Sequence, residues 1–486
     1  MENAARRRLD AVLFAASAAA FVVLRIPLYT QPGLQLGWNS DSALFGIIAR
    51  EMVRESKVLW FFPGQDYLGT LTSMFAVAVG LLMNDVGPLA LRLAVAFELI
   101  LGLFFFWDAL RRTWGRGAAH LVVFWLVAGP SWFFKLSYAP NAEQMFLVGA
   151  AITWFVASRR FETLWQWAIL GILGGLGWWA HRGAVLVLPA AVMTVVWFDG
   201  WRGWRRVTNA ALAFGAGIAL GCLPLLAGRL QIDQPLYRPV TAVWSLDRAA
   251  QRLVETLMND FWTFLGAREH RFGVLLAVVM VSLAAAGASR LRRERNSVFL
   301  IISLATSLGF WIFSTNAYSG ATRYLALALP IVLGLAARGV VLLWSWTPAA
   351  RVVAVAAVLL VAVSYYGGRI LETNRIAAGK GEQHEQWPGG FDPRPALRQL
   401  RDGDYRACYA DFWIAYKLEW LSGVPFIPYR SVDRTQMRSI RLAALPGPKC
   451  RVGMDGTVSR LSAPEEAALR AETVAHHLRR ARSESR

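Results

Sequence analysis

The sequence has little of what most soluble enzymes use for chemistry. Its 486 residues include only six histidines and three cysteines. No two histidines have the spacing of metal ligands in the long polar loops, and His476-His477 lies in a basic tail, where solvation explains it. A glycine-rich phosphate loop after a strand, a Gly-x-Ser-x-Gly motif and a His-Glu-x-x-His motif are all absent. These absences exclude the common soluble classes of nucleotide-binding protein, serine hydrolase and zinc protease.

Acidic residues are also scarce, since 32 Asp and Glu stand against 51 Lys and Arg, a net charge of +19. In a soluble protein this charge would suggest a nucleic-acid partner. Hydrophobic residues, however, are 56% of the chain, with 22 Trp and 27 Phe, which is too apolar for a soluble protein of this length. Most arginines lie in short clusters between apolar runs, the pattern that orients membrane helices. The composition predicts a polytopic membrane protein and no nucleic-acid partner.

About eleven apolar runs are suited to cross a bilayer as helices. Each has roughly 16 to 22 residues, near the ~20 that span the hydrocarbon core. The first follows a basic start like that of a signal peptide, but it is long and has no clear cleavage site, so we expect an uncleaved span. The predicted spans are residues 11–29, 89–110, 118–134, 142–158, 163–180, 184–199, 207–228, 272–289, 297–315, 322–343 and 350–367.

The positions of the arginine clusters indicate which ends of these spans lie on the same side of the membrane. With the spans above, six clusters fall on one side, which should be the cytoplasm. This holds only if the apolar run at residues 68–83 does not cross, and glycine, threonine and serine dilute its first half. We therefore expect a second helix at the outer membrane face there, a cytoplasmic N-terminus and an external C-terminus. The clusters are residues 6–8, 111–116, 159–160, 202–206, 290–295 and Arg351.

The predicted domains follow from this topology. Residues 1–367 form a helical membrane domain, with a first outer loop at 30–88 and a second, containing an amphipathic helix, at 229–271. Residues 368–394 have the composition of a linker. Residues 395–486 form a small external α/β domain with a basic tail. We expect helices at 395–401 and 412–421, strands at 405–410, 425–429 and 449–452, and a charged helix or disordered end from 464.

Two of the three cysteines, Cys408 and Cys450, lie in this C-terminal domain, and Cys222 lies in an apolar span. Disulfides form outside the cytoplasm. If the domain is external, Cys408 and Cys450 could form a disulfide or remain free thiols.

One carboxylate, Asp41, opens an amphipathic helix in the first outer loop. Polar or small residues recur there every four positions, at Ser42, Gly46, Arg50 and Arg54, with apolar residues opposite. Such a helix lies in the membrane interface. Asp41 can cap the first amides of this helix, the ordinary role of such a residue, or it can carry chemistry at the bilayer edge. The two roles are compatible.

Further polar residues gather at the outer ends of the spans. Lys135 ends the third span, Glu143 begins the fourth, and His181-Arg182 and Arg323-Tyr324 lie at later turns. Each cation alone could be an anchor to lipid headgroups. Three cations and an acid at one face would suit a lipid-linked phosphate, because arginine offers phosphate a planar fork and lysine a point charge. Nearby Trp and Tyr could be an interfacial belt or a sugar-stacking surface.

Glu98 lies near the middle of the second span. A carboxylate is costly there, so Glu98 should be protonated or paired. The sequence assigns it no functional role.

Several local motifs occur in a characteristic order, although each is degenerate. They are Asp41-Ser42, residues 49–52 (Ala-Arg-Glu-Met), residues 62–71, Arg323-Tyr324-Leu325 leading to Pro330, and residues 409–416. With the span count, the first outer loop and the external C-terminal domain, the chain resembles the GT-C superfamily of glycosyltransferases. This superfamily includes the protein O-mannosyltransferases and the aminoarabinose transferases. The resemblance implies a GT-C-like fold of about eleven transmembrane helices, with interfacial helices in the first outer loop.

The resemblance also implies a reaction. A sugar would pass from a polyprenyl phosphate to an acceptor hydroxyl on the external face of the plasma (inner) membrane, with inversion and without an obligatory metal or other cofactor. The first-loop motif of the family is usually Asp-Glu, and its Asp is catalytic, which implies that role for Asp41; position 42 is Ser here. Arg323 matches the phosphate-binding residues by motif, and Arg182 and Lys135 match by location.

Further possible substrate contacts are Tyr67, His181, Tyr324 and Glu143. The expected partners are membrane lipids, the polyprenyl-phosphate sugar and a glycan, lipid or protein acceptor. Two other functions stay open. A transporter or flippase of lipid-linked glycans would place functional charges within the spans. A non-catalytic scaffold would not need the first-loop motif.

Overall fold

The computed structural model describes most of the chain, with gaps in several loops. The described residues are 2–30, 40–62, 68–137, 142–201, 203–231, 246–269, 272–291, 294–313, 322–377, 391–429 and 436–484.

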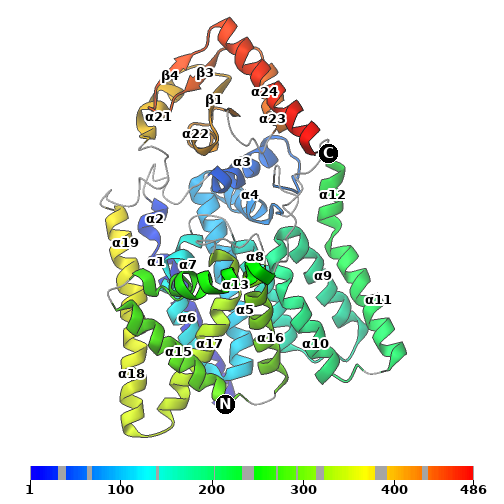
Figure 1. The fold of residues 1–486 in the computed structure, drawn as a ribbon, viewed down its shortest axis with the longest axis vertical. Helices are drawn as coiled ribbons and strands as arrows, with labels where there is room; N and C mark the ends of the chain where they lie inside the picture. The colour runs from blue at the N-terminus through cyan, green and yellow to red at the C-terminus, as the bar shows by residue number, and fades with distance from the viewer. Residues whose placement is uncertain are drawn as a thin grey trace.

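The described chain is mostly helical, and a helix overlaps each of the eleven predicted spans (Figure 1). Several spans consist of two or three consecutive helical segments. The segments are α1 (Glu2–Val23) with α2 (Ile26–Thr30), α5 (Pro88–Trp114), α6 (Arg116–Ala128) with α7 (Ser131–Leu136), α8 (Glu143–Ser158), α9 (Leu164–Ala180), η1 (Arg182–Val187) with α10 (Leu188–Phe198), α11 (Trp204–Gly221) with α12 (Leu223–Gln231), α15 (Gly273–Ser289), α16 (Arg295–Phe313), η4 (Thr322–Leu325) with α17 (Ala328–Trp344), and α18 (Pro348–Ala362) with η5 (Val363–Gly367) and α19 (Gly368–Ala377).

In the described part of the chain, four helices are individually long and apolar enough to cross a membrane: Pro88–Trp114, Trp204–Gln231, Arg295–Phe313 and Pro348–Asn374. The last of these extends into α19, so helix replaces the start of the predicted linker. Arg369 of α19 is buried and pairs with Glu372 one turn later, which supports the extension.

Close approach of backbones holds the helices together where side chains are small. On α9, a Cβ at Gly171 would lie 2.1 Å from the carbonyl oxygen of Phe214 on α11. On α11, a Cβ at Gly217 would lie 2.1 Å from the carbonyl oxygen of Ala168. No larger residue fits at these two positions without separating the helices, as expected of membrane helix pairs that pack through glycine.

Two of the arginine clusters predicted to share one side, 111–116 and 290–295, make ion pairs with buried aspartate side chains. The distances are 2.9 Å from Arg116 to Asp10, 2.6 Å from Arg112 to Asp108, and 2.7 Å from Arg295 to Asp199. The N-terminus lies at the end of the bundle opposite the C-terminal sheet (Figure 1).

The first outer loop contains α3 (Ser40–Arg54) and α4 (Leu71–Met83), which lie between the bundle and the C-terminal sheet (Figure 1). At about 1.5 Å per residue, the 13 residues of α4 extend ~20 Å, less than the ~30 Å of the hydrocarbon core. The chain then turns at Asn84, whose φ of 54° is left-handed, and α4 packs along α5. The second outer loop contains α13 (Leu246–Glu255), a π-helical turn η2 (Thr256–Asp260), α14 (Phe261–Phe264) and η3 (Ala267–Glu269).

The C-terminal domain has a four-stranded sheet in the order β2-β1-β3-β4. β1 pairs in parallel with β2 and β3, and β4 is antiparallel to β3. β4 and α23 were not predicted; β4 has only three residues, and two of them are polar. The elements are α21 (Pro393–Asp402), β1 (Ala407–Asp411), α22 (Phe412–Ser422), β2 (Phe426–Tyr429), α23 (Gln436–Ala444), β3 (Lys449–Val452), β4 (Val458–Arg460) and α24 (Ala463–Glu484).

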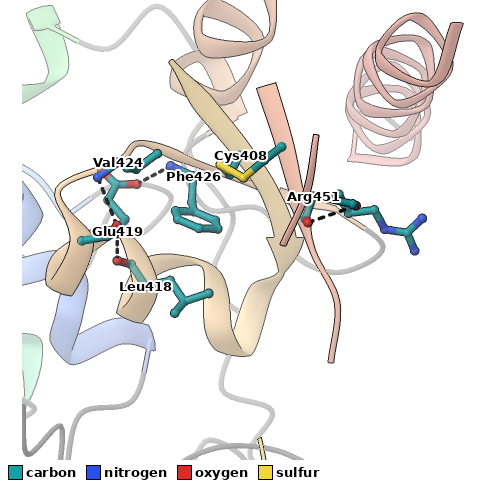
Figure 2. The surroundings of a disulfide bond; sticks show 9 residues. Cys408, Leu418, Glu419, Val424, Phe426 and Arg451 are labelled. Atoms are coloured by element: carbon teal, nitrogen blue, oxygen red, sulfur yellow. Dashed lines mark hydrogen bonds between the residues drawn. A yellow bond between two sulfur atoms is a disulfide. The ribbon is translucent and has the colours of Figure 1, made fainter. Parts of the chain in front are cut away.

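Cys408 of β1 and Cys450 of β3 are register partners in the sheet and form a disulfide. Figure 2 shows this bond in yellow, with Cys408 labelled. Of the two states that the sequence left open for Cys408 and Cys450, the structure has the disulfide. On the other side of β1, the Glu419 carboxylate accepts a hydrogen bond of 2.9 Å from the Phe426 amide, which ties α22 to β2 (Figure 2).

The C-terminal domain covers the face of α3 that the sequence pattern marks as polar. A Cβ at Gly46 would lie 2.4 Å from the indole ring of Trp420 on α22. One turn later, the Arg50 guanidinium lies 3.9 Å from the centre of that ring and donates to the Trp420 carbonyl oxygen at 2.8 Å. Gly46 and Arg50 of this stripe therefore face α22, whereas Arg54 at the end of α3 is exposed.

The contact predicts a steric conflict in the variant Gly46→Ala. Because Trp420 is buried, the new methyl group must displace it, at a cost of about 1–3 kcal/mol in the free energy of unfolding. Gly309→Ala is the matched control, since a Cβ there meets nothing within 4 Å and alanine favours helix. In detergent, the midpoint of thermal unfolding should fall for Gly46→Ala and not for Gly309→Ala. In a double-mutant cycle, a second change, Trp420→Leu, should reduce the loss of stability caused by Gly46→Ala. If the stability losses of the two single variants simply add in the double variant, the contact is contradicted.

Candidate functional site

In the first outer loop, the segment that leads into α4 is hydrogen-bonded to the turn between α9 and η1. Leu68 forms an isolated β-bridge with His181, and the Gly69 amide donates to the Ala180 carbonyl oxygen at 3.1 Å. A Cβ at Gly69 would lie 2.8 Å from the carbonyl oxygen of Trp179, so only glycine allows this approach. Residues more than one hundred positions apart thus meet at one end of the bundle.

His181 is buried at this junction. Its Nδ1 accepts a hydrogen bond of 3.1 Å from the Gly183 amide, which leaves Nε2 as the protonated nitrogen of a neutral ring. Burial lowers the pKa of His181 to about 4, and the positive charge of Arg323 adds to the effect. The ring centre lies 5.9 Å from that of Tyr324. The structure therefore brings together His181, Arg323 and Tyr324.

The three predicted phosphate-binding cations lie on neighbouring elements and are all half-buried. The Arg323 guanidinium is 5.1 Å from the centre of the Tyr324 ring in η4, and the Arg182 guanidinium is 5.4 Å from the Trp178 ring. Lys135 is in the last turn of α7, which packs against η4. The neighbouring aromatic ring helps to orient each planar guanidinium, which suits bidentate hydrogen bonding to the oxygens of a phosphate.

The start of α8 adjoins the same junction. The Gln144 amide nitrogen lies 3.4 Å from the Gly69 carbonyl oxygen. Glu143, a predicted substrate contact, is fully buried and lies 2.7 Å from the Thr72 hydroxyl of α4. A substrate contact by Glu143 therefore stays a prediction.

Asp41 lies in the first turn of α3, and its side chain is outside the described part of the chain. Tyr67 is outside the described residues altogether. One turn after Asp41, the Phe45 carbonyl oxygen accepts a hydrogen bond of 2.8 Å from Ser73, in the first turn of α4. The backbone of Asp41 is thus held near the beginning of α4, where Thr72 contacts Glu143.

The folded chain matches solved membrane proteins over nearly its whole length. ArnT from Cupriavidus metallidurans bound to undecaprenyl phosphate superposes with a TM-score of 0.59 at 14% identity, over 91% of this chain and 92% of that one. The same protein in the apo state gives a TM-score of 0.58. The archaeal oligosaccharyltransferase AglB from Archaeoglobus fulgidus, in complex with an inhibitory peptide and a dolichol-phosphate, gives 0.51 at 13% identity, over 92% and 70% of the chains. This chain has the GT-C fold.

The expected GT-C-like membrane fold is therefore confirmed. No protein-family model matches the sequence, and no curated protein matches it either. Within the GT-C fold, the outer loop is joined to the bundle by Gly69, Thr72 and Gln144, and its two helices are joined by Ser73; the sequence marked none of the four as functional. For Gly69, Thr72 and Ser73 the only signal was the dilution of the apolar run 68–83 by polar or small residues, and Gln144 stands out only as the neighbour of Glu143.

The neutral state of His181 predicts a pH dependence of stability. As pH falls from about 6.5 to about 4, the unfolded chain binds a proton at His181 and the folded chain does not, so the folded state loses up to ~3 kcal/mol. Above about pH 6.5 the residue contributes no such dependence. His181→Asn keeps an acceptor for the Gly183 amide but cannot titrate. Its unfolding midpoint should fall less than that of the wild type between about pH 7 and about pH 5; equal falls would contradict the buried neutral ring.

Proposed function

We propose that this protein is a membrane glycosyltransferase that moves a sugar from a polyprenyl-phosphate donor to an acceptor hydroxyl at the external face. The observation that carries the proposal is the junction of four distant segments: the segment before α4 in the first outer loop, the start of α8, the His181 turn and η4 with Arg323. The solved ArnT and AglB structures hold undecaprenyl phosphate and dolichol-phosphate, which supports an isoprenoid phosphate as the ligand of this fold.

The mechanism follows from the charges at the junction. The acceptor hydroxyl attacks the anomeric carbon while Asp41 takes or orients its proton as a general base. The bond from the anomeric carbon to the phosphate oxygen breaks, and polyprenyl phosphate leaves with its negative charge stabilised by Arg323, Arg182 and Lys135. A single displacement of this kind inverts the anomeric centre.

The neutral His181 ring can donate from Nε2 without adding charge, so it suits contact with a sugar hydroxyl or a phosphate ester oxygen. Tyr324 lies beside it, and Tyr67 and Glu143 are further candidates for contact with the donor or acceptor. The acceptor is a glycan, a lipid or a protein carrying a free hydroxyl.

The orientation that fits this function has the N-terminus in the cytoplasm and the C-terminal domain outside the plasma membrane. The arginine clusters and the Cys408–Cys450 disulfide support it, since disulfides persist outside the cytoplasm. The catalytic junction then opens to the external leaflet.

The decisive variant is Asp41→Asn, which keeps the size and a capping oxygen but removes the base. Purified protein incubated with a panel of polyprenyl-phosphate sugars should hydrolyse or transfer one of them, and Asp41→Asn should lower that rate by at least about a hundredfold. Glu55→Gln, an exposed acid just after the same helix, is the matched control and should leave the rate unchanged. Near-normal transfer by Asp41→Asn would exclude Asp41 as the base. Movement of the lipid across vesicles without any transfer would favour a flippase.

We also propose that the reaction needs no obligatory metal, because the first-loop motif carries one carboxylate, Asp41, followed by Ser42. Transfer should persist after dialysis against EDTA. A loss that Mn²⁺ or Mg²⁺ restores would contradict this proposal.

A further inference from the structure

Two buried acids from different spans lie against one hydroxyl group. The Thr72 oxygen is 2.9 Å from Oε2 of Glu98 on α5 and 2.7 Å from Oε1 of Glu143 on α8. Both glutamates have no exposed surface. Thr72 lies in the first turn of α4, so this group of three connects the outer loop to two membrane helices.

Counting hydrogens shows that the two acids cannot both be ionised in this arrangement. A threonine hydroxyl carries one hydrogen and can donate to only one of the two oxygens. The other oxygen is also within hydrogen-bond distance and must donate to the hydroxyl, which only a protonated carboxyl group can do. Two carboxylates around one buried hydroxyl would also repel each other strongly.

The surroundings of each acid decide where the proton is. Glu143 is the first residue of α8, where free backbone amides and the helix dipole stabilise a negative charge. Glu98 is in the middle of α5, away from either helix end, and its Oε1 is buried without a hydrogen-bond partner among the described residues. An ionised Glu98 would leave that oxygen uncompensated, whereas a protonated carboxyl group tolerates it.

We propose that Glu98 is a protonated positioning residue which, through the Thr72 hydroxyl, holds ionised Glu143 at the outer end of α8. Glu98 donates to Thr72, and Thr72 donates to Glu143. Gln144, next along the chain, contacts Gly69, and Ser73, next to Thr72, holds the Phe45 carbonyl oxygen. The chain of hydrogen bonds thus fixes both α3, which begins with the Asp41 turn, and the segment of the outer loop that leads into α4. The inference rests on the proposed function only for its activity readout.

The test uses variants that show whether position 98 needs a carboxyl group or only a hydrogen-bond donor. Glu98→Ala should lower sugar transfer at least about tenfold, and Glu98→Gln should restore it to within about twofold, because its amide nitrogen donates to Thr72 as a protonated carboxyl group does. Thr72→Val should lower transfer to a similar degree, and Thr72→Ser, which keeps the hydroxyl, should restore it. The unfolding midpoints of the full-length proteins in detergent should follow the same order. A Glu98→Gln variant as impaired as Glu98→Ala would overturn the proposal.

An infrared measurement tests the proton itself and is independent of any substrate. The spectrum of the wild type should contain a carbonyl band of a protonated carboxyl group that is lost in Glu98→Gln and kept in Glu143→Gln. Loss of the band in Glu143→Gln alone would place the proton on Glu143 and overturn the assignment. If no donor is turned over, the proposed function fails, while the infrared band and the order of stabilities still decide the role of Glu98.

Discussion

The arrangement of the first outer loop depends on the hydroxyl groups at the start of α4. A helix at the membrane edge must satisfy its buried polar groups within the protein, because little water reaches them. Thr70 donates to the Leu59 carbonyl oxygen, Thr72 contacts two acids of the bundle, and Ser73 donates to the Phe45 carbonyl oxygen. These three hydroxyls thus contact four segments, the chain at Leu59 and the helices α3, α5 and α8, and together they determine where α3 and its Asp41 turn lie.

The C-terminal domain provides the opposing constraint. α4 holds α3 from the side of the bundle, and Trp420 and Arg50 hold it from the side of the sheet. α22, which carries Trp420, is tied to β2 through Glu419, and β1 is tied to β3 by the disulfide. The C-terminal domain therefore supports the position of α3, in addition to any role in selecting the acceptor. Because Asp41 is in the first turn of α3, a change in the fold of the domain would alter the position of Asp41.

The sequence was sufficient to predict features that depend on consecutive residues. Apolar runs predict the spans because length and composition decide whether a helix crosses a bilayer. Arginine parity predicts that residues 68–83 do not cross, and the 13 residues of α4 agree with that prediction. It could not show contacts between distant segments. Gly46 and Trp420 are separated by more than three hundred residues, and neither is unusual alone. Glu98 was visible as a costly acid, but its partner on α4 and the second acid on α8 meet only in the folded chain.

The packing of α3 also bears on the missing second carboxylate. Relatives with an Asp-Glu motif would place an acid at position 42, where this chain has a fully buried serine. An ionised glutamate there would need a buried counter-charge, whereas serine needs only a hydrogen bond. The buried negative charge near the junction lies instead at Glu143, where a helix N-terminus compensates it. In the proposed reaction, this arrangement leaves one acid, Asp41, at the outer edge for proton transfer, and the cations remain available to the leaving phosphate.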